Sequence, residues 1–156
     1  MKQIMKIRLE SPDQAEVLAL IAELDAYQHS LYPPESVYSM DMASVAEETL
    51  LFAVARDDQG NAVGCGGIVL YPAYGEVKRM YVRPENRGQS IARQILTELE
   101  QQALNAGCSK LKLETGPLHR EALGLYASFG YQQRGPFGSY PDDPLSVFMQ
   151  KHLSAA

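Results

Sequence analysis

The stretch from Arg87 to Ala92 combines residue types that bind phosphate groups. It follows a β-rich run from Glu76 to Val82 and precedes a periodic apolar segment that predicts a helix beginning near Ser90. The first turn of a helix has unpaired backbone N–H groups and the positive end of the helix dipole. Gly88 can take a positive φ and let backbone approach a ligand closely, and Arg87 adds a positive charge. The sequence therefore predicts a phosphate cradle at this turn.

Three other side chains are candidates for acid and base chemistry. Glu76 opens the run that precedes the cradle, and Glu114 ends a short alternating run further along the chain. Tyr126 lies on a second periodic apolar segment, and its phenol is a hydrogen-bond donor with an ordinary pKa near 10. Carboxylates and phenols act as general bases and acids when they lie within hydrogen-bond reach of a reacting group.

Alternating and periodic apolar patterns predict the elements that position these residues. A helix is expected after the capping signal Ser11-Pro12-Asp13-Gln14, a second helix from Ser90, and a third from about Ala122 to Gly130. Residues 132–144 are expected to form a loop, which at that length is usually functional or disordered. Strands are expected over residues 4–9, 50–55, 62–70, 76–82, 111–114 and 146–153.

The composition excludes several classes of protein. The chain has 156 residues, of which 46% are hydrophobic and 21% charged, and no apolar run approaches the ~20 residues that span a bilayer. A net charge of −5 without a lysine or arginine cluster argues against a nucleic-acid partner. Cys65 and Cys108 lack metal-site spacing, so no metal is expected. Residues 1–10 lack a signal-peptide pattern, so a cytoplasmic location and no membrane partner are expected.

Two segments carry a resemblance to a known family. Arg87-Gly88-Gln89-Ser90-Ile91-Ala92 resembles the pyrophosphate loop of the GNAT superfamily of N-acetyltransferases, Q/R-x-x-G-x-G/A, with Ser90 where the family usually has glycine. The run from Glu121 to Tyr131 resembles the second GNAT signature, A-x-x-L-Y-x-x-x-G-F/Y. His119 stands where that signature has an upstream asparagine. The resemblance covers nearly the whole chain and is strongest over residues 76–131.

This resemblance implies a fold and an activity. The expected fold is α/β, with a mixed, largely antiparallel central sheet of about six to seven strands flanked by about four helices, in one domain over residues 1–156. The implied activity is direct transfer of an acetyl group from acetyl-CoA to a primary amine. Acetyl-CoA is then a co-substrate, and the acceptor is a small amine or a peptide N-terminus. A homodimer is one of the assemblies that the sequence allows.

The resemblance also assigns roles to particular residues. A bulge in the central strand is expected to expose backbone to the pantetheine chain, and the upstream asparagine position would add a cofactor contact. Tyr126 is implied as the proton donor to the coenzyme A thiolate. Glu76 is implied as the general base, with Glu114 as the second candidate. The implied cofactor-binding residues are Met80, Tyr81, Val82, Arg87, Gly88, Gln89, Ser90, Ile91, Ala92 and His119.

Other functions are weighed against this one. A degenerate module that binds acyl-CoA without turnover is the main alternative, although it would not need Tyr126 and Glu76. A nucleotide-phosphate enzyme is disfavoured because the chain has no Walker lysine and no carboxylate cluster for magnesium. The acceptor site is expected beside the segment from Tyr27 to Met42, whose tyrosines and methionines suit either a substrate wall or packing between helices.

Overall fold

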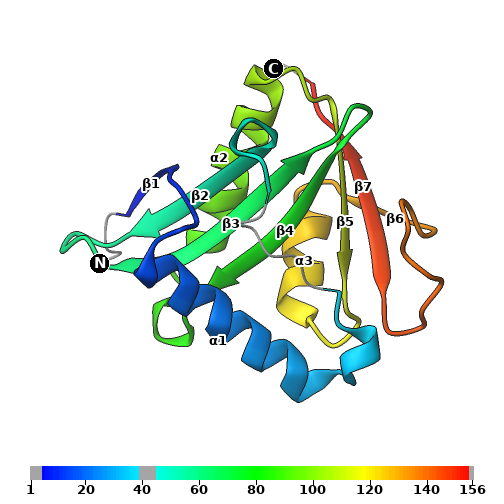
Figure 1. Cartoon of the computed structure of the whole chain (residues 1–156), viewed down its shortest axis with the longest axis horizontal. Helices are drawn as coiled ribbons and strands as arrows, with labels where there is room; N and C mark the ends of the chain where they lie inside the picture. The colour runs from blue at the N-terminus through cyan, green and yellow to red at the C-terminus, as the bar shows by residue number, and fades with distance from the viewer. Residues whose placement is uncertain (1–4, 39–44, 155–156) are drawn as a thin grey trace.

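The computed structural model describes residues 5–38 and 45–154. The α-helices are α1 Ala15–Leu31, α2 Ile91–Asn105 and α3 Arg120–Ser128. The strands are β1 Lys6–Leu9, β2 Leu50–Arg56, β3 Ala62–Leu70, β4 Gly75–Val82, β5 Lys110–Thr115, β6 Gln132–Arg134 and β7 Val147–His152. They form one seven-stranded sheet in the order β1-β2-β3-β4-β5-β7-β6 (Figure 1).

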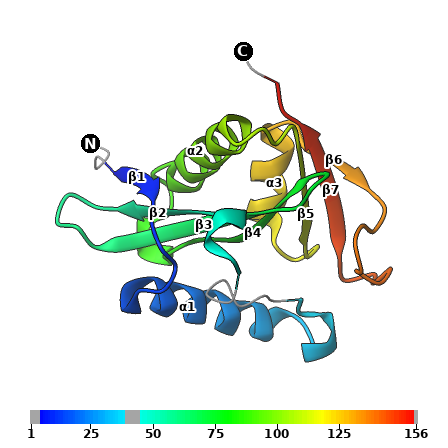
Figure 2. The ribbon, with the colours of Figure 1, turned by 45° about the horizontal axis from the view of Figure 1, so that its top comes forward.

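The sheet lies between two layers of helix, with α1 against one face and α2 and α3 against the other (Figure 2). All neighbouring strands run antiparallel except β4 and β5, which are parallel. This confirms the expected mixed, largely antiparallel sheet. The core on the α2 side is built on Ile95, Leu96 and Leu99, and the core on the α1 side includes Val17 and Leu20.

The number of helices differs from the expectation of about four. The described residues contain three α-helices together with the short 3-10 turns Pro34–Ser36, Glu47–Thr49 and Pro84–Asn86. Pro33 and Pro34 follow the end of α1 directly, and a residue before proline is disfavoured in the α conformation. Met40 and Met42 of the expected acceptor wall lie outside the described residues. Within those residues, no helix is both long and apolar enough to cross a membrane.

Two element boundaries were predicted wrongly. The first helix begins at Ala15 and not directly after Ser11, because the Ser11 hydroxyl accepts the backbone N–H of Asp13 at 3.1 Å in a local turn. Strand β6 falls in the expected loop, where it pairs with β7. All three of its residues are polar and exposed, so they show no alternation from which a strand could be predicted. The start of α2 directly after Ser90 was predicted correctly.

A β-bulge in β4 reverses which side chains face each layer. Cys65 pairs with Tyr81 and Gly67 with Lys78, so Arg79 and Met80 together lie opposite one glycine of β3. Arg79 has a φ of 63°, in the left-handed region. Before the bulge Val77 packs in the α2-side core, whereas after it Met80 packs there and Tyr81 packs in the α1-side core.

Gly66 makes room for the bulge. A Cβ atom at this position would lie 2.2 Å from the Met80 sulfur and 3.1 Å from Cγ2 of Ile95. The glycine-rich run of β3 therefore serves close packing inside a strand.

Gly66→Ala is expected to destabilise the protein by about 1–3 kcal/mol, because the added methyl group pushes Met80 out of its packed position. Gly124→Ala is the matched control. A Cβ at Gly124, on α3, meets no atom within 4 Å, so the same chemical change there should stabilise the protein by about 0.5–1 kcal/mol. Urea unfolding measures both. Equal stability of Gly66→Ala and wild type would contradict the packing role of Gly66.

Candidate active site

The candidate site lies where β4 and β5 separate. Their parallel pairing joins Gly75–Val77 to Leu111–Leu113, and beyond it the two strands diverge (Figure 1). The edge of β4 after Val77 therefore faces the gap with its backbone groups. An extended ligand chain can hydrogen-bond to such an edge as an added strand would. The bulge expected near Met80 is present at this point.

Two cavities meet in this gap. The first, which we call the Arg87 cavity, has a volume of about 290 Å³ and is lined by Val82, Arg87 and Ala92 among others. The second, the Glu114 cavity, has a volume of about 100 Å³ and is lined by residues of β4, β5, the end of α1 and the segment after it. Leu24, Met80, His119, Ala122 and Tyr126 line both cavities, so their walls are continuous.

The cradle at the start of α2 has an unusual backbone. Gly88 has a φ of 82° and Ser90 a φ of 62°, so both are left-handed. Ser90 thus adopts the conformation that the glycine of the family pattern takes without strain. Arg79 and Ser90 are the two non-glycine residues with positive φ among those described, and both border the site. Such strain typically costs about 1–3 kcal/mol and collects at functional sites.

The cradle residues divide between side-chain and backbone roles. Arg87 is fixed to the strand end by a hydrogen bond from its Nε to the Val82 carbonyl oxygen at 3.2 Å. Gly88 and Ser90 are exposed at the surface of the turn, beside the partly exposed Gln89. The Ile91 side chain is buried in the α2-side core, so this residue offers a ligand only its backbone. An anion at this turn meets the N-terminus of α2 and the Arg87 guanidinium together.

Tyr126 lies on α3 at the junction of the two cavities, with 5% of its surface exposed. Its ring packs edge-on against Tyr131 at a centroid distance of 5.5 Å. Burial raises the pKa of Tyr126 well above its ordinary value, because the phenolate would lose its hydration. The phenol therefore remains protonated and available as a donor.

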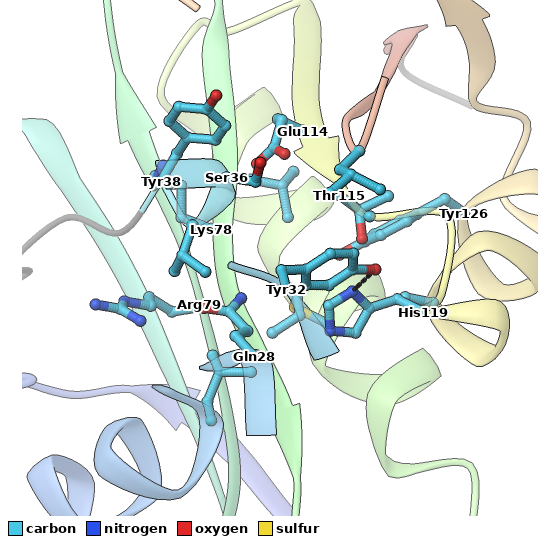
Figure 3. Close-up of a pocket in the computed structure, with 17 residues that line it drawn as sticks. Gln28, Tyr32, Ser36, Tyr38, Lys78, Arg79, Glu114, Thr115, His119 and Tyr126 are labelled. Atoms are coloured by element: carbon cyan, nitrogen blue, oxygen red, sulfur yellow. Dashed lines mark hydrogen bonds between the residues drawn. The ribbon is translucent and has the colours of Figure 1, made fainter. Parts of the chain in front are cut away.

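His119 reaches the same junction from the start of α3. The Tyr32 hydroxyl lies 3.2 Å from its Nδ1 and accepts the backbone N–H of Leu118 at 2.9 Å (Figure 3). The Tyr32 hydroxyl is then the donor to Nδ1, which puts the imidazole proton on Nε2. Nε2 is buried, with no hydrogen-bond partner in the described part of the chain. Burial lowers the pKa of His119, so the neutral ring presents a donor to a bound acceptor atom.

The two candidate bases have different surroundings. Glu114 lines the Glu114 cavity (Figure 3). It accepts the Ser146 hydroxyl at 2.8 Å. Burial raises its pKa above the ordinary value of a glutamate, against the opposing effect of the Ser146 hydrogen bond. Glu76 does not contribute to the lining of this cavity or of the Arg87 cavity and is only 4% exposed. It accepts the Tyr140 hydroxyl at 2.5 Å and the Lys78 ammonium at 3.4 Å.

Lys78 and Tyr140 were not singled out from the sequence. Lys78 lies two residues after Glu76, so strand alternation already places the two side chains on one face. Tyr140 lies in the loop before β7, and no local pattern links it to Glu76. Its hydroxyl accepts the Lys78 ammonium at 2.9 Å, which closes a three-membered network under that loop. The carboxylate of Glu76 is thereby hydrogen-bonded to Lys78 and Tyr140, whereas Glu114 faces the Glu114 cavity.

Comparisons with known proteins agree with this geometry. The profile of the acetyltransferase (GNAT) family matches residues 16–131. The chain is 47% identical over 149 residues to the IAA acetyltransferase of Azospirillum brasilense, covering 94% of this chain and 97% of that protein. A solved structure from Klebsiella pneumoniae, provisionally named an acyl-CoA N-acyltransferase, is 41% identical with a TM-score of 0.88, covering 97% of this chain and 99% of that one.

A more distant structure shares the fold. The PaiA N-acetyltransferase of Thermoplasma acidophilum, solved in complex with coenzyme A, has a TM-score of 0.75 at 18% identity and covers 96% of this chain and 99% of that one. The chain belongs to the acetyltransferase (GNAT) family. It is an N-acetyltransferase that takes its acetyl group from acetyl-CoA. The comparisons give no support to a module that binds acyl-CoA without turnover.

Coenzyme A is expected to raise the melting temperature of the protein. A ligand that binds only the native state adds roughly 2.7 kcal/mol of stability at a hundredfold excess over Kd. Arg87→Glu should abolish most of this shift, because it places a negative charge against the pyrophosphate. Arg8→Glu is the control, since Arg8 is exposed on β1 and lines neither cavity. If coenzyme A raises the melting temperature of Arg87→Glu as much as that of wild type, the cradle is not part of the cofactor site.

Proposed function

We propose that the protein acetylates a primary amine held in the Glu114 cavity, with the coenzyme A chain in the Arg87 cavity and its pyrophosphate at the cradle. The observation that carries this proposal is the meeting of the two cavities at Met80, His119 and Tyr126. One cavity ends at a carboxylate suited to an ammonium group, and the other begins at a helix N-terminus suited to phosphate. Only at the junction can groups bound in both cavities touch.

The residues fit an acyl-CoA ligand in three places. The N-terminus of α2 and the guanidinium of Arg87 suit a diphosphate, and the part of β4 beyond Val77, which does not pair with β5, suits the amides of pantetheine. The buried Nε2 of His119 supplies a donor for a carbonyl oxygen near the junction. When bound, acetyl-CoA supplies a thioester whose acyl carbon is open to attack by an amine. The chain itself binds, orients and moves protons.

Glu114 is the proposed general base. An amine acceptor arrives protonated near pH 7 and cannot attack until that proton leaves. A glutamate whose pKa is raised by burial accepts a proton more readily than an exposed one. Lys78 approaches both Glu76 and Glu114, but its hydrogen bonds go to Glu76 and Tyr140. We assign Glu76 the role of holding Lys78 and Tyr140 in place.

Tyr126 is the proposed acid. Its place on both cavity walls brings the phenol to the point where a thioester would have to lie. Its raised pKa keeps the proton on the oxygen until a developing thiolate accepts it.

Glu114→Gln should lower kcat/KM by ~10²–10⁴-fold at neutral pH, because the amide keeps the shape but cannot accept the proton. Activity should partly recover as the pH approaches the pKa of the amine, which then loses its proton to water. Glu76→Gln is the matched control and should show a pH profile parallel to that of wild type, although with reduced stability. The reverse pattern, with alkaline recovery in Glu76→Gln alone, would transfer the role of base to Glu76.

Tyr126→Phe should lower kcat by a similar factor, ~10²–10⁴-fold, while the Kd for acetyl-CoA changes little, because the ring remains and only the proton donor is lost. Tyr131→Phe is the control. Tyr131 is also buried, packs against Tyr126 and donates to Glu100 at 2.8 Å, but it lines neither cavity. It should lose stability and keep its turnover. Wild-type kcat in Tyr126→Phe would reduce Tyr126 to a packing role.

A further inference from the structure

The loop between β6 and β7 closes over the Glu114 cavity. We call residues 135–146 the strap. Phe137 anchors it by packing edge-on against Phe148 and Tyr74 at centroid distances of 5.8 and 5.7 Å. At its other end, Ser146 is bound to Glu114 and Tyr140 is bound to Glu76 and Lys78. The strap is therefore held near its start by Phe148 of β7 and by Tyr74, and further along by Glu76 and Lys78 of β4 and by Glu114 of β5.

One carboxylate joins the strap to the segment that follows α1. The Tyr38 hydroxyl donates to Asp143 at 2.8 Å, and the Ser36 hydroxyl donates to the same carboxylate. The backbone N–H of Leu145 lies 2.8 Å from Asp143 and, with these hydroxyls, lowers the pKa of the carboxyl. We call the bonds of Asp143 to Ser36 and Tyr38 the latch. Because the pKa is lowered, the latch carboxylate stays ionised throughout the pH range in which the enzyme can work.

The latch connects elements that lie far apart in the sequence but both line the Glu114 cavity. Ser36 and Tyr38 of the segment after α1 line it (Figure 3), and so does Leu145 of the strap. The Tyr38 ring also meets the Tyr140 ring edge-on at 5.6 Å. The far wall of the cavity is thus made by contacts between the two elements themselves. The opposite end of the cavity leads to the Arg87 cavity, which the cofactor fills under the proposed function.

A peptide acceptor would require a different shape. Its N-terminal amine would have to reach Glu114 while the following residues extend away at ~3.3 Å each along a groove with backbone partners. Because the latch and the contact between Tyr38 and Tyr140 join the segment after α1 to the strap, we infer that no open groove for such a chain runs between these two elements. The volume of about 100 Å³ is also small beside the ~300–1,000 Å³ of pockets that enclose larger ligands. A small molecule can enter during a brief opening of the strap, whereas a peptide would hold the strap open throughout the reaction.

We propose that the acceptor is a small free amine of about the size of an amino acid, and that the latch excludes peptide N-termini. This inference rests on the proposed use of the Glu114 cavity as the acceptor site. It makes Ser36, Tyr38 and Asp143 specificity-determining residues, although none of them takes part in proton transfer. Breaking the latch should therefore change which amines react and leave the cofactor step unaltered.

The test compares free amino acids and short alkyl amines with tripeptides that begin with the same residue, using acetyl-CoA as donor and thiol release as the readout. In the wild-type protein, kcat/KM for the best small amine should exceed that for the matching tripeptide by about 100-fold. Tyr38→Phe and Asp143→Asn should each reduce this ratio by about tenfold. The KM for acetyl-CoA should remain as in wild type.

Two matched controls accompany these variants. Asp142→Asn removes the same charge one position away, at an exposed residue outside the cavity lining. Tyr71→Phe removes a hydroxyl from an exposed tyrosine outside both cavities. Both should keep the wild-type ratio. An unchanged melting shift with coenzyme A shows that each variant is folded.

Different failures have different meanings. Suppose that the wild-type protein acetylates tripeptides as well as small amines, and that the latch variants change the KM for the acceptor. This result would overturn the proposed restriction to small amines but would leave the Glu114 cavity as the acceptor site. Latch variants that change the KM for acetyl-CoA and leave that for the amine unchanged would show that this cavity does not hold the acceptor. That outcome would overturn the proposed function and the size limit together.

Discussion

The site depends on the bulge in β4 at Arg79. It ends the pairing with β5, reverses the facing of the following side chains, and leaves the strand edge beside Met80 free for a ligand. Its left-handed residue costs about 1–3 kcal/mol, which the surroundings must offset. The Arg79 guanidinium pairs with Asp25 on α1, and the buried Cys65 thiol donates to the Arg79 carbonyl oxygen at 3.4 Å. Burial raises the pKa of Cys65 to about 12, so the thiol keeps the proton that it donates.

Charge pairing bears on which of two carboxylates faces the Glu114 cavity. The register that pairs Val77 with Leu113 would continue to Lys78 and Glu114, so Glu76, Lys78 and Glu114 share one face of neighbouring strands. Two unpaired carboxylates on the same face of neighbouring strands would repel each other. The Lys78 ammonium prevents this repulsion by binding Glu76, and it also donates to the Tyr140 hydroxyl. Its charge lowers the pKa of Glu114, against the raising effect of burial. Removing Lys78 would leave two carboxylates on one face of the sheet without a positive charge between them.

The predictable part of the structure rests on local patterns. Alternation located β2, β3, β4, β5 and β7, and the two short signatures lie at the start of α2 and on α3. Strand β6 and the first turn of α1 were missed because polar residues form them through pairing or local hydrogen bonds that leave no periodic signal. The left-handed backbone at Ser90 could not be predicted either, since serine more often occupies an extended N-cap.

The acceptor side was less predictable for a physical reason. The segments around the Glu114 cavity are held together by pairs such as Tyr38 with Asp143 and Tyr140 with Glu76, separated by 105 and 64 positions in the chain. Neither partner of these pairs lies in a repeating pattern, so only the folded backbone brings them together. The choice between Glu76 and Glu114 was open for the same reason. A glutamate on a strand is equally compatible with an ion pair and with a cavity wall until its neighbours are known.

Burial at the cavity junction also bears on how Tyr126 can act as an acid. The ordinary pKa of a phenol, about 10, lies above that of a thiol, about 8.5, so proton transfer to a thiolate in water costs about 2 kcal/mol. Burial raises the pKa of Tyr126 further, which alone would make the transfer harder. A thiolate leaving into the same junction loses hydration as well, so its pKa rises too and the difference need not widen. The low polarity of the junction therefore strengthens a hydrogen bond between phenol and sulfur and shifts both pKa values in the same direction.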